Sequence, residues 1–337
     1  MRYFLILIPA ILWFYIQKTP NAISKNTWKE NSSLSRILTD LGNTSHLKKE
    51  KDYTKEQVSI GEDLVKNGFT KRRKGSKVIS VYYQCTSCHN LVQEDPKPES
   101  PDPQARLRFT NEKGIPFLQA TTFWGIVNRE SWYNGDYIKK YGSLVEEAKD
   151  DIEASIQLCA QECAQGRVLK QWEVDAIMAY FWELELKLSD LNLTDNEMER
   201  LNKITSEDKK SEAIKLLKSK YMLASPATFS DAPYDKSKGY EVDKRDPING
   251  KLIYENSCLH CHDKNGVTEY ELNHSKLSFK KLLRDMEKDN PLSFYQAIRY
   301  GTSAAPGYRP YMPHYTLERM SDQQVEDLRA YIEQEAM

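Results

Sequence analysis

Two short motifs of identical spacing constrain this chain more than any other feature of its sequence. Residues 85–89 read Cys-Thr-Ser-Cys-His, and residues 258–262 read Cys-Leu-His-Cys-His. The chain has six cysteines, and these motifs take four of them. Cys-x-x-Cys-His is the attachment signature of a c-type haem, in which the thiols add to the haem vinyl groups and the adjacent imidazole binds the iron. The sequence therefore predicts two covalently bound haem c groups.

Paired cysteines also occur in zinc sites and in redox-active dithiols. A structural zinc site needs four ligands, so a second cysteine pair would have to lie near each motif. Two copies of the motif in a chain with an export-type segment favour haem over both alternatives. The predicted attachment and proximal iron-binding residues are Cys85, Cys88, His89, Cys258, Cys261 and His262.

An apolar stretch near the N-terminus predicts export. Residues 3–16 read YFLILIPAILWFYI and lie between Arg2 and Lys18. Fourteen residues suit a signal-peptide core better than a membrane span, which needs about 20 residues. No clear cleavage site follows, so residues 1–18 are predicted to be a signal peptide or an uncleaved N-terminal anchor; a buried core helix is the alternative. Because bacteria attach haem c outside the cytoplasm, the predicted location is the periplasm, with the protein either free or tethered to the membrane.

Charge is balanced along the chain. Lys and Arg number 48 against 49 Asp and Glu, and both signs are interspersed. This pattern is typical of a solvated surface and leaves no large basic field for nucleic acid. Small anions and other redox proteins are the expected partners.

Each motif is followed by a similar amphipathic stretch, at residues 170–188 and 318–336. In both, apolar residues recur at i, i+3, i+6 and i+7, which places them on one helical face. The matched positions are Val174, Ile177, Tyr180 and Phe181 in the first stretch, and Val325, Leu328, Tyr331 and Ile332 in the second.

A Cys-x-x-Cys-His motif early in a domain and a closing helix of the form Val-x-x-(Ile/Leu)-x-Ala-Tyr resemble class I cytochrome c. The resemblance implies a mainly α fold in which helices wrap the haem and the first and last helices cross. Residues 59–69 and 246–258 would be the opening helices. Gly61 and Gly250 would lie at the two crossings, because glycine permits a close backbone approach.

The expected architecture is therefore two class I-like cytochrome c domains joined by a helical connector and a linker. Polar composition with scattered Leu and Ile predicts the connector, and a proline-containing stretch without apolar runs predicts the linker. The predicted ranges are a polar tether at 19–54, a first domain at 55–188, the connector and linker at 189–245, and a second domain at 246–337.

The second domain offers a sixth iron ligand. Met312 precedes Pro313 and lies ahead of the closing helix, which resembles the position of the methionine ligand in class I cytochromes c. A thioether opposite His262 would raise the haem potential and suit an electron relay. Met320 and His314 are the alternative ligands.

The first domain lacks a methionine between His89 and its closing helix, where Met178 falls on the apolar face. Residues 115–142 resemble the active-site haem domain of dihaem thiosulfate dehydrogenases and related sulfur-oxidising cytochromes. In that family, a tract of the form Asn-x-Cys-Phe-x-Arg-Ser-x-Asn-Gly supplies a cysteine ligand. Matching its Asn-Gly to residues 134–135 places Asn128 at the cysteine position. Asn128 would then bind weakly, another residue would replace it, or one face of the iron would be open.

Cys159 and Cys163 are the remaining cysteines, four residues apart. An oxidising compartment favours a disulfide between them. A thiolate ligand from one of them and a pair of free thiols remain open as alternatives.

Basic residues near the same segment suit an anionic sulfur compound, because guanidinium groups bind and orient oxyanions. Arg106, Arg108 and Arg129 are the predicted anion-binding residues, with Lys139 and Lys140 close by in the sequence. The alternative for each is a solvated surface charge.

These features predict a dihaem oxidoreductase that acts on a sulfur anion such as thiosulfate or tetrathionate at the first haem. The second haem would relay electrons to a soluble cytochrome or a terminal oxidase. The alternative is a non-catalytic dihaem electron-transfer cytochrome of a respiratory chain; a peroxidase-like dihaem enzyme is a third possibility, which no residue specifically calls for.

Overall fold

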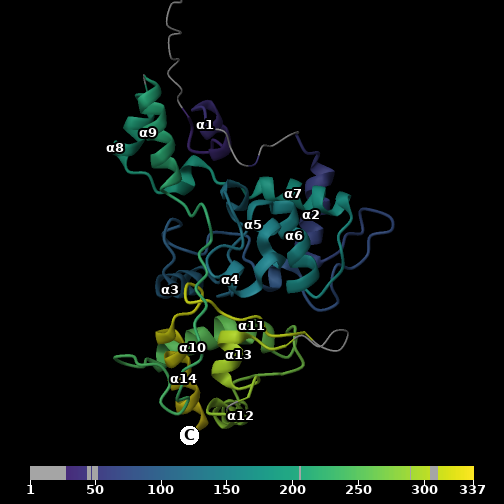
Figure 1. Ribbon diagram of the computed structural model, residues 1–337, viewed down its shortest axis with the longest axis vertical. Coiled ribbons are helices and arrows are strands. Elements are labelled where there is room, and N and C mark those ends of the chain that lie inside the picture. Colours follow the sequence, from purple (N-terminus) through teal and green to yellow (C-terminus); the bar gives the residue numbers. More distant parts are fainter. Residues whose placement is uncertain (1–27, 44–46, 48–51, 205, 289, 304–309) are drawn as a thin grey trace, which may run out of the picture.

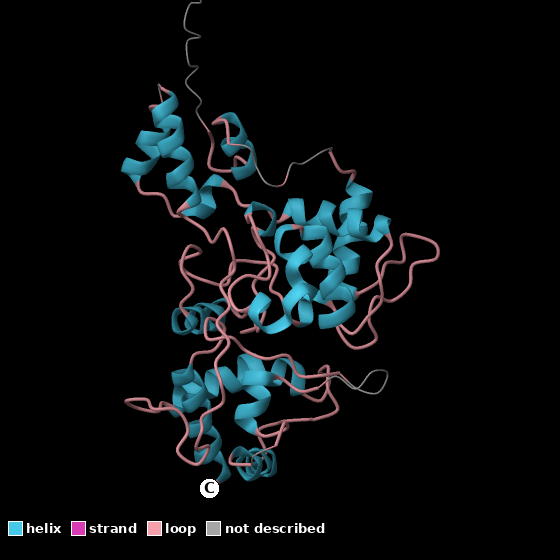
Figure 2. Cartoon of the chain, viewed as in Figure 1, coloured by secondary structure: helices cyan, strands magenta, loops and turns pink. Residues whose placement is uncertain are grey.

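The computed structural model describes residues 28–43, 47, 52–204, 206–288, 290–303 and 310–337. Over these residues the chain is mainly helical and contains no β-strand, only two isolated β-bridges (Figure 2). The prediction of a mainly α fold is confirmed. The predicted signal peptide or anchor at residues 1–18 lies outside the described residues. Among the helices that the structure describes, none is both long and apolar enough to cross a membrane.

Fourteen α-helices follow one another along the described chain. They are α1 (Leu34–Asp40), α2 (Lys55–Asn67), α3 (Pro103–Lys113), α4 (Tyr137–Tyr141), α5 (Glu146–Asp150), α6 (Ile152–Leu158), α7 (Gln171–Glu183), α8 (Asp195–Asn202), α9 (Glu207–Lys218), α10 (Pro247–Ile253), α11 (Leu259–His262), α12 (Lys276–Met286), α13 (Phe294–Tyr300) and α14 (Asp322–Ala336). Short 3₁₀ turns include η1 (Cys85–Ser87), η2 (Ile126–Asn128) and η5 (Leu188–Leu191), and two π-helical turns are η4 (Cys159–Cys163) and η6 (Tyr254–Cys258).

The first half of the described chain corresponds to the predicted domain at 55–188, and the second half to that at 246–337. In the first half, the opening helix α2 and the closing helix α7 cross at Gly61, as the sequence predicts. A Cβ atom built on Gly61 of α2 would lie 1.8 Å from the carbonyl oxygen of Ala176 in α7. The same atom would lie 2.9 Å from Cβ of Tyr180. No side chain fits at this distance, so glycine is required for the two backbones to touch.

The second half repeats this crossing with α10 and α14. A Cβ atom on Gly250 would lie 2.0 Å from the carbonyl oxygen of Asp327 and 2.9 Å from Cβ of Tyr331. Tyr331 is the residue that the sequence repeat matches to Tyr180. Ser321 is the N-cap of α14 and accepts a hydrogen bond from the backbone N–H of Gln324 at 3.2 Å. The two halves therefore use the same helix crossing.

Each half has its own apolar core, but the cores do not follow the predicted boundaries closely. One core packs α2 against α7, and a second packs α10, α12, α13 and α14 together. Leu107 of α3 and Phe117 belong to the second core, although both precede the closing helix of the first half. The backbone N–H of Phe117 donates to the carbonyl of Asn256 at 2.8 Å. Figure 1 shows α3 next to α10. Residues of the first half therefore pack within the core of the second half.

A third core lies outside both halves. The helical connector folds as α8 and α9, and these pack with η5 and α1. The prediction that residues 19–54 form only a polar tether is therefore wrong for the part that the structure describes. Leu34, Ile37, Leu38 and Leu41 follow the i, i+3, i+4, i+7 spacing of an apolar helical face, and all four are buried. The surrounding polar residues hide this short pattern in the sequence.

Replacing Gly250 with alanine is expected to destabilise the second half. The added methyl group collides with the backbone of Asp327 rather than with a flexible side chain, so α10 and α14 must separate. Overpacking of this kind costs about 1–3 kcal/mol of unfolding free energy. Denaturant unfolding of the haem-loaded protein measures the loss. Lys251→Ala is the matched control, because Lys251 is the exposed neighbour of Gly250; equal stability of the two variants would contradict the crossing.

Candidate haem-binding sites

The first motif folds so that one nitrogen of its histidine is committed to the protein and the other is available. Nδ1 of His89 lies 2.6 Å from the carbonyl oxygen of Thr121, and the imidazole stacks on Phe123 with 4.1 Å between the ring centroids. The carbonyl can only accept, so Nδ1 carries the proton. Burial lowers the pKa of His89 to about 4, so the ring is neutral near pH 7. Nε2 then carries the lone pair that a metal requires.

The second motif has the same arrangement. Nδ1 of His262 lies 2.8 Å from the carbonyl oxygen of Tyr270, and burial lowers the pKa of His262. The motif lies on η6 and α11, which follow α10 without a break. A hydrogen bond from Nδ1 to a backbone carbonyl fixes both the tautomer and the ring orientation of a metal-binding histidine.

The four motif cysteines are free thiols, with no disulfide within either pair. Burial raises the pKa of Cys85 to about 11 and that of Cys258 to about 12, and it raises the pKa of Cys88 and Cys261 as well. Protonated thiols beside a neutral, oriented imidazole fit the residues that hold haem c through two thioether bonds and one iron ligand.

A protein-family model described as cytochrome C oxidase, cbb3-type, subunit III matches residues 245–332. Residues 245–332 form a c-type cytochrome domain. The matched range contains the second motif, Met312 and most of α14, and a domain of this type binds haem c and transfers electrons. The matched range does not include the first motif, at residues 85–89. No curated protein and no solved structure matches the chain.

Within this cytochrome domain, the backbone at Met312 is held firmly. Its N–H donates to Oγ1 of Thr302 at 2.7 Å, and its carbonyl accepts from the N–H of Thr302 at 2.9 Å. The Met312 side chain packs against the second core. These contacts place Met312 but do not test its binding to iron, which stays a prediction.

The two alternative ligands of the cytochrome domain are engaged elsewhere. Met320 is 1% exposed in the second core. The ring of His314 lies 4.8 Å from that of Phe229 and 6.5 Å from that of Tyr141, measured between centroids, so it faces the linker and α4. The burial of Met320 and the ring contacts of His314 favour Met312 as the predicted iron ligand.

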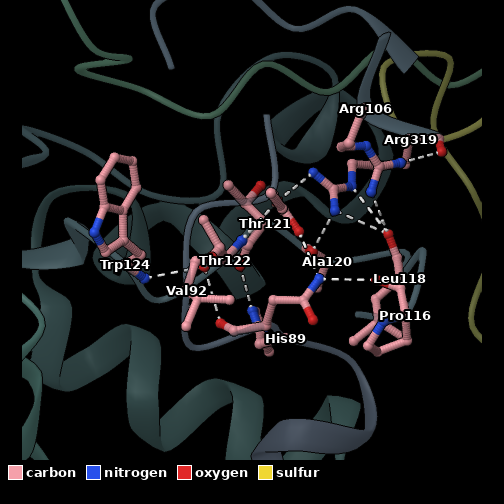
Figure 3. A network of polar contacts seen from close by, with 12 residues as sticks. His89, Val92, Arg106, Pro116, Leu118, Ala120, Thr121, Thr122, Trp124 and Arg319 are labelled. Atoms are coloured by element: carbon pink, nitrogen blue, oxygen red, sulfur yellow. Dashed lines mark hydrogen bonds and ion pairs between the residues drawn. The ribbon is translucent and has the colours of Figure 1, made fainter. Parts of the chain in front are cut away.

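A buried ionic network holds the backbone segment whose Thr121 carbonyl contacts His89 (Figure 3). The backbone N–H of Thr122 donates to Oε1 of Glu94 at 2.9 Å, and Nη1 of Arg319 lies 2.8 Å from the same oxygen. Arg319 also donates to the carbonyls of Leu118 and Ala120, at 2.9 and 2.7 Å. The segment that carries the hydrogen-bond acceptor of His89 is thus fixed by an arginine from the cytochrome domain.

The charge of Glu94 depends on this network. Burial alone would raise its pKa, but the Arg319 and Arg106 guanidinium groups bring the pKa of Glu94 down to about 2. Sequence reasoning missed both Glu94 and Arg319. They are 225 residues apart, and no local pattern links them.

The three arginines predicted to bind a sulfur anion differ in exposure, and two of them are buried. Arg106 is 1% exposed and donates to the carbonyls of Leu118 and Arg319, with its guanidinium 3.9 Å from the ring centroid of Phe117. Arg129 is 7% exposed and donates to the carbonyl of Thr122 at 2.7 Å. Arg108 is exposed on α3. Two of the three are internal structural residues, which argues against the predicted anion site.

The geometry also argues against Asn128 as an iron ligand. Its Oδ1 accepts from the N–H of Leu186 at 2.7 Å, and its Nδ2 donates to Oγ of Ser35 at 3.0 Å. Both ends of the amide are therefore bonded to protein. Asn128 ties η2 to α1 and to the segment that follows α7.

Cys159 and Cys163 are free thiols at the two ends of the π-helical turn η4. The Tyr133 hydroxyl lies 3.8 Å from Sγ of Cys163. Charges on Cys85 and Cys88 affect the pKa of Cys159, so the pair lies near the first motif.

Of the two lysines noted near the predicted anion site, Lys140 lies with Nζ 4.2 Å from the ring centroid of Phe229.

Replacing Arg319 with methionine is expected to destabilise the protein strongly, because Glu94 would remain buried without its ionic partner. Breaking a buried pair in this way costs about 3–5 kcal/mol. Arg284→Met is the control, since Arg284 pairs with Asp285 at the surface, and exposed pairs contribute about 0–1 kcal/mol. Urea unfolding of both variants measures the difference. Similar losses would show that the Glu94–Arg319 pair adds nothing beyond a surface contact.

Proposed function

We propose that the protein is a dihaem c-type cytochrome that moves electrons between two neighbouring haems. The first half supports a second haem because it repeats both features of the cytochrome domain: the glycine-mediated helix crossing and a motif histidine bonded through Nδ1 to a carbonyl. A c-type haem supplies a one-electron Fe(III)/Fe(II) couple. Met312 is the proposed second axial ligand of the haem on His262.

One observation carries this proposal: the two attachment motifs lie side by side. Burial lowers the pKa of His260, between Cys258 and Cys261, and the nearby backbone of Ser87 and Thr86 in the first motif raises it. Charge on Cys261 affects the pKa of Cys88. Haems bonded to these cysteines would be anchored at adjacent points of the chain, which suits direct electron exchange.

Further contacts hold the two motifs in place. The Tyr83 hydroxyl donates to the carbonyl of Tyr311, and the N–H of Tyr311 donates to Oε1 of Gln165 at 3.0 Å. Tyr83 also lies within electrostatic reach of both Cys88 and Cys261. These contacts connect the first half directly with the loop that carries Met312.

The electron partner we propose is a soluble cytochrome or a terminal oxidase in the periplasm. The family that matches residues 245–332 is described as an oxidase subunit, which supports such a partner. The apolar segment at residues 3–16 supports export and a possible tether to the membrane.

The mass of the purified protein tests the dihaem proposal. We expect two covalent haem additions, because each motif provides two thiols and one oriented imidazole. Replacing Cys85 and Cys88 together with alanine should leave one addition, and the matched change at Cys258 and Cys261 should do the same. Intact-protein mass spectrometry and haem-stained denaturing gels measure this. A single addition in the wild-type protein would remove the relay and leave a monohaem cytochrome.

A second candidate function is oxidation or reduction of an inorganic sulfur anion such as thiosulfate at the first haem. It is favoured by the position of Cys163 near Cys88, because a thiolate there can replace the cysteine that the family tract would supply. Hydrogen bonds from Cys159 and Tyr133 lower the pKa of Cys163, which favours its thiolate.

Turnover with thiosulfate or tetrathionate tests this second candidate. We expect the Cys163→Ser variant to lose turnover while it keeps both haem additions, because only the thiolate is removed. Gln161→Ala, in the same turn, is the control and should keep activity. Wild-type protein that turns over neither anion would leave electron transfer as the function.

A further inference from the structure

The pair of cysteines in η4 is unused by the electron relay and is chemically distinct from the other four. Of the six cysteines, the two motifs contain four. If both motifs carry haem, as the proposed function states, those four are thioethers. Cys159 and Cys163 are then the only thiols left in the protein.

The two thiols are positioned to form a bond with each other. They are free thiols at the first and last residues of one helical turn. Four residues of helix advance by about 6 Å. Disulfides usually join Cα atoms about 4.4–6.8 Å apart, so a bond here needs little backbone movement. No third His, Cys, Asp or Glu completes a metal site with them among the residues that the structure describes.

A permanent structural bridge at this position would add little. The turn is already fixed, because Oγ of Ser80 donates to the carbonyl of Ala164 at 2.5 Å and the N–H of Gly166 donates to that of Ala160 at 3.0 Å. A disulfide stabilises mainly by closing a loop in the unfolded chain, and this effect is smallest for the shortest loops. A pair four residues apart therefore serves folding poorly.

The surroundings of the pair suit redox chemistry. The Tyr133 hydroxyl lies 3.8 Å from Sγ of Cys163, and Ala160 of the same turn belongs to the core against which Cys85 of the first motif packs. From the second half, the N–H of Tyr311 donates to Oε1 of Gln165, two residues beyond Cys163, at 3.0 Å. The pair thus lies close to the residues that anchor the first haem and to the loop that joins the two halves.

We propose that Cys159 and Cys163 form a reversible dithiol–disulfide couple that exchanges electrons with the two haems. Oxidation forms one S–S bond, breaks two S–H bonds, and releases two protons to solvent and two electrons. Each ferric haem takes one of these electrons, so one dithiol matches two haems. The reverse reaction, fed by two ferrous haems and two protons, restores the thiols.

Alkylation of the haem-loaded protein tests the couple. Samples poised with both haems ferrous and with both haems ferric are treated with N-ethylmaleimide, and their intact masses are compared. We expect two adducts in the ferrous sample and none in the ferric sample. Two adducts in both samples, or none in both, would overturn the couple. A single adduct in the ferric sample would indicate an iron-bound thiolate and would overturn it as well.

An electron count provides a second readout. Full reduction should consume four electron equivalents in the wild-type protein and in Gln161→Ala, but two in Cys159→Ser, because only the two haems remain. Two equivalents in the wild-type protein would also overturn the couple. The same mass spectra report the number of haem additions, so loss of the dihaem proposal is recognised separately from failure of the cysteine couple.

Discussion

The closeness of two pairs of helices determines how this chain can hold its motifs. At Gly61 and Gly250 the backbone of the opening helix lies against a carbonyl of the closing helix, with no room for a side chain. In the second half, α10 runs through η6 into α11, so the motif follows directly from the crossing. In the first half, a loop separates α2 from the motif, which begins on the short turn η1. The crossing is common to both halves, whereas the approach to the motif differs.

The boundary between the halves depends on buried polar contacts rather than on a smooth apolar surface. Arg319 reaches from the cytochrome domain to Glu94 and to two backbone carbonyls of the first half. The same segment carries Thr121, the hydrogen-bond acceptor of His89. A change in how the halves pack would therefore alter the orientation of that histidine. The hydrogen bond of a metal-binding histidine tunes its basicity, so the two sites are physically linked.

Motifs and helix caps could be predicted from the sequence, but the distant partners of buried polar residues could not. The two motifs and the N-cap at Ser321 depend on residues close together in the chain, and the structure has this N-cap. The crossings at Gly61 and Gly250 are the exception, because they join helices far apart in the chain and were indicated by the sequence repeat and the resemblance to class I cytochrome c. The sequence predicts anion binding by Arg106 and Arg129 because guanidinium groups orient oxyanions, with a solvated surface charge as the alternative. Both are instead buried; Arg106 donates to the carbonyl of Arg319, far along the chain, and Arg129 donates to that of Thr122. No spacing rule indicates such partners.

Helix α1 shows that the distant packing partners of apolar residues could not be predicted from the sequence either. Its buried residues Leu34, Ile37 and Leu38, with Leu41 directly after the helix, form one short face. That face packs in one core with residues of α8, α9 and η5, which lie more than a hundred residues further along the chain. A seven-residue helix is unstable alone, so its existence depends on this packing. The tract around Asn128 is fixed in turn by Ser35, one of the residues of α1. This hydrogen bond links the helix within the predicted tether to the residue predicted as an iron ligand.

The burial of the arginines also bears on which function the first half can support. A guanidinium binds a soluble anion only if it can exchange its protein acceptors for the anion, and Arg106 and Arg129 already donate to backbone carbonyls inside the protein. Releasing them would leave those carbonyls unpaired and would remove positive charge that holds Glu94 ionised. Tyr133 and Cys163, which lie 3.8 Å apart, are the remaining candidates for anion chemistry at the first half. Electron transfer needs no such rearrangement, because the two motifs already lie side by side at His260.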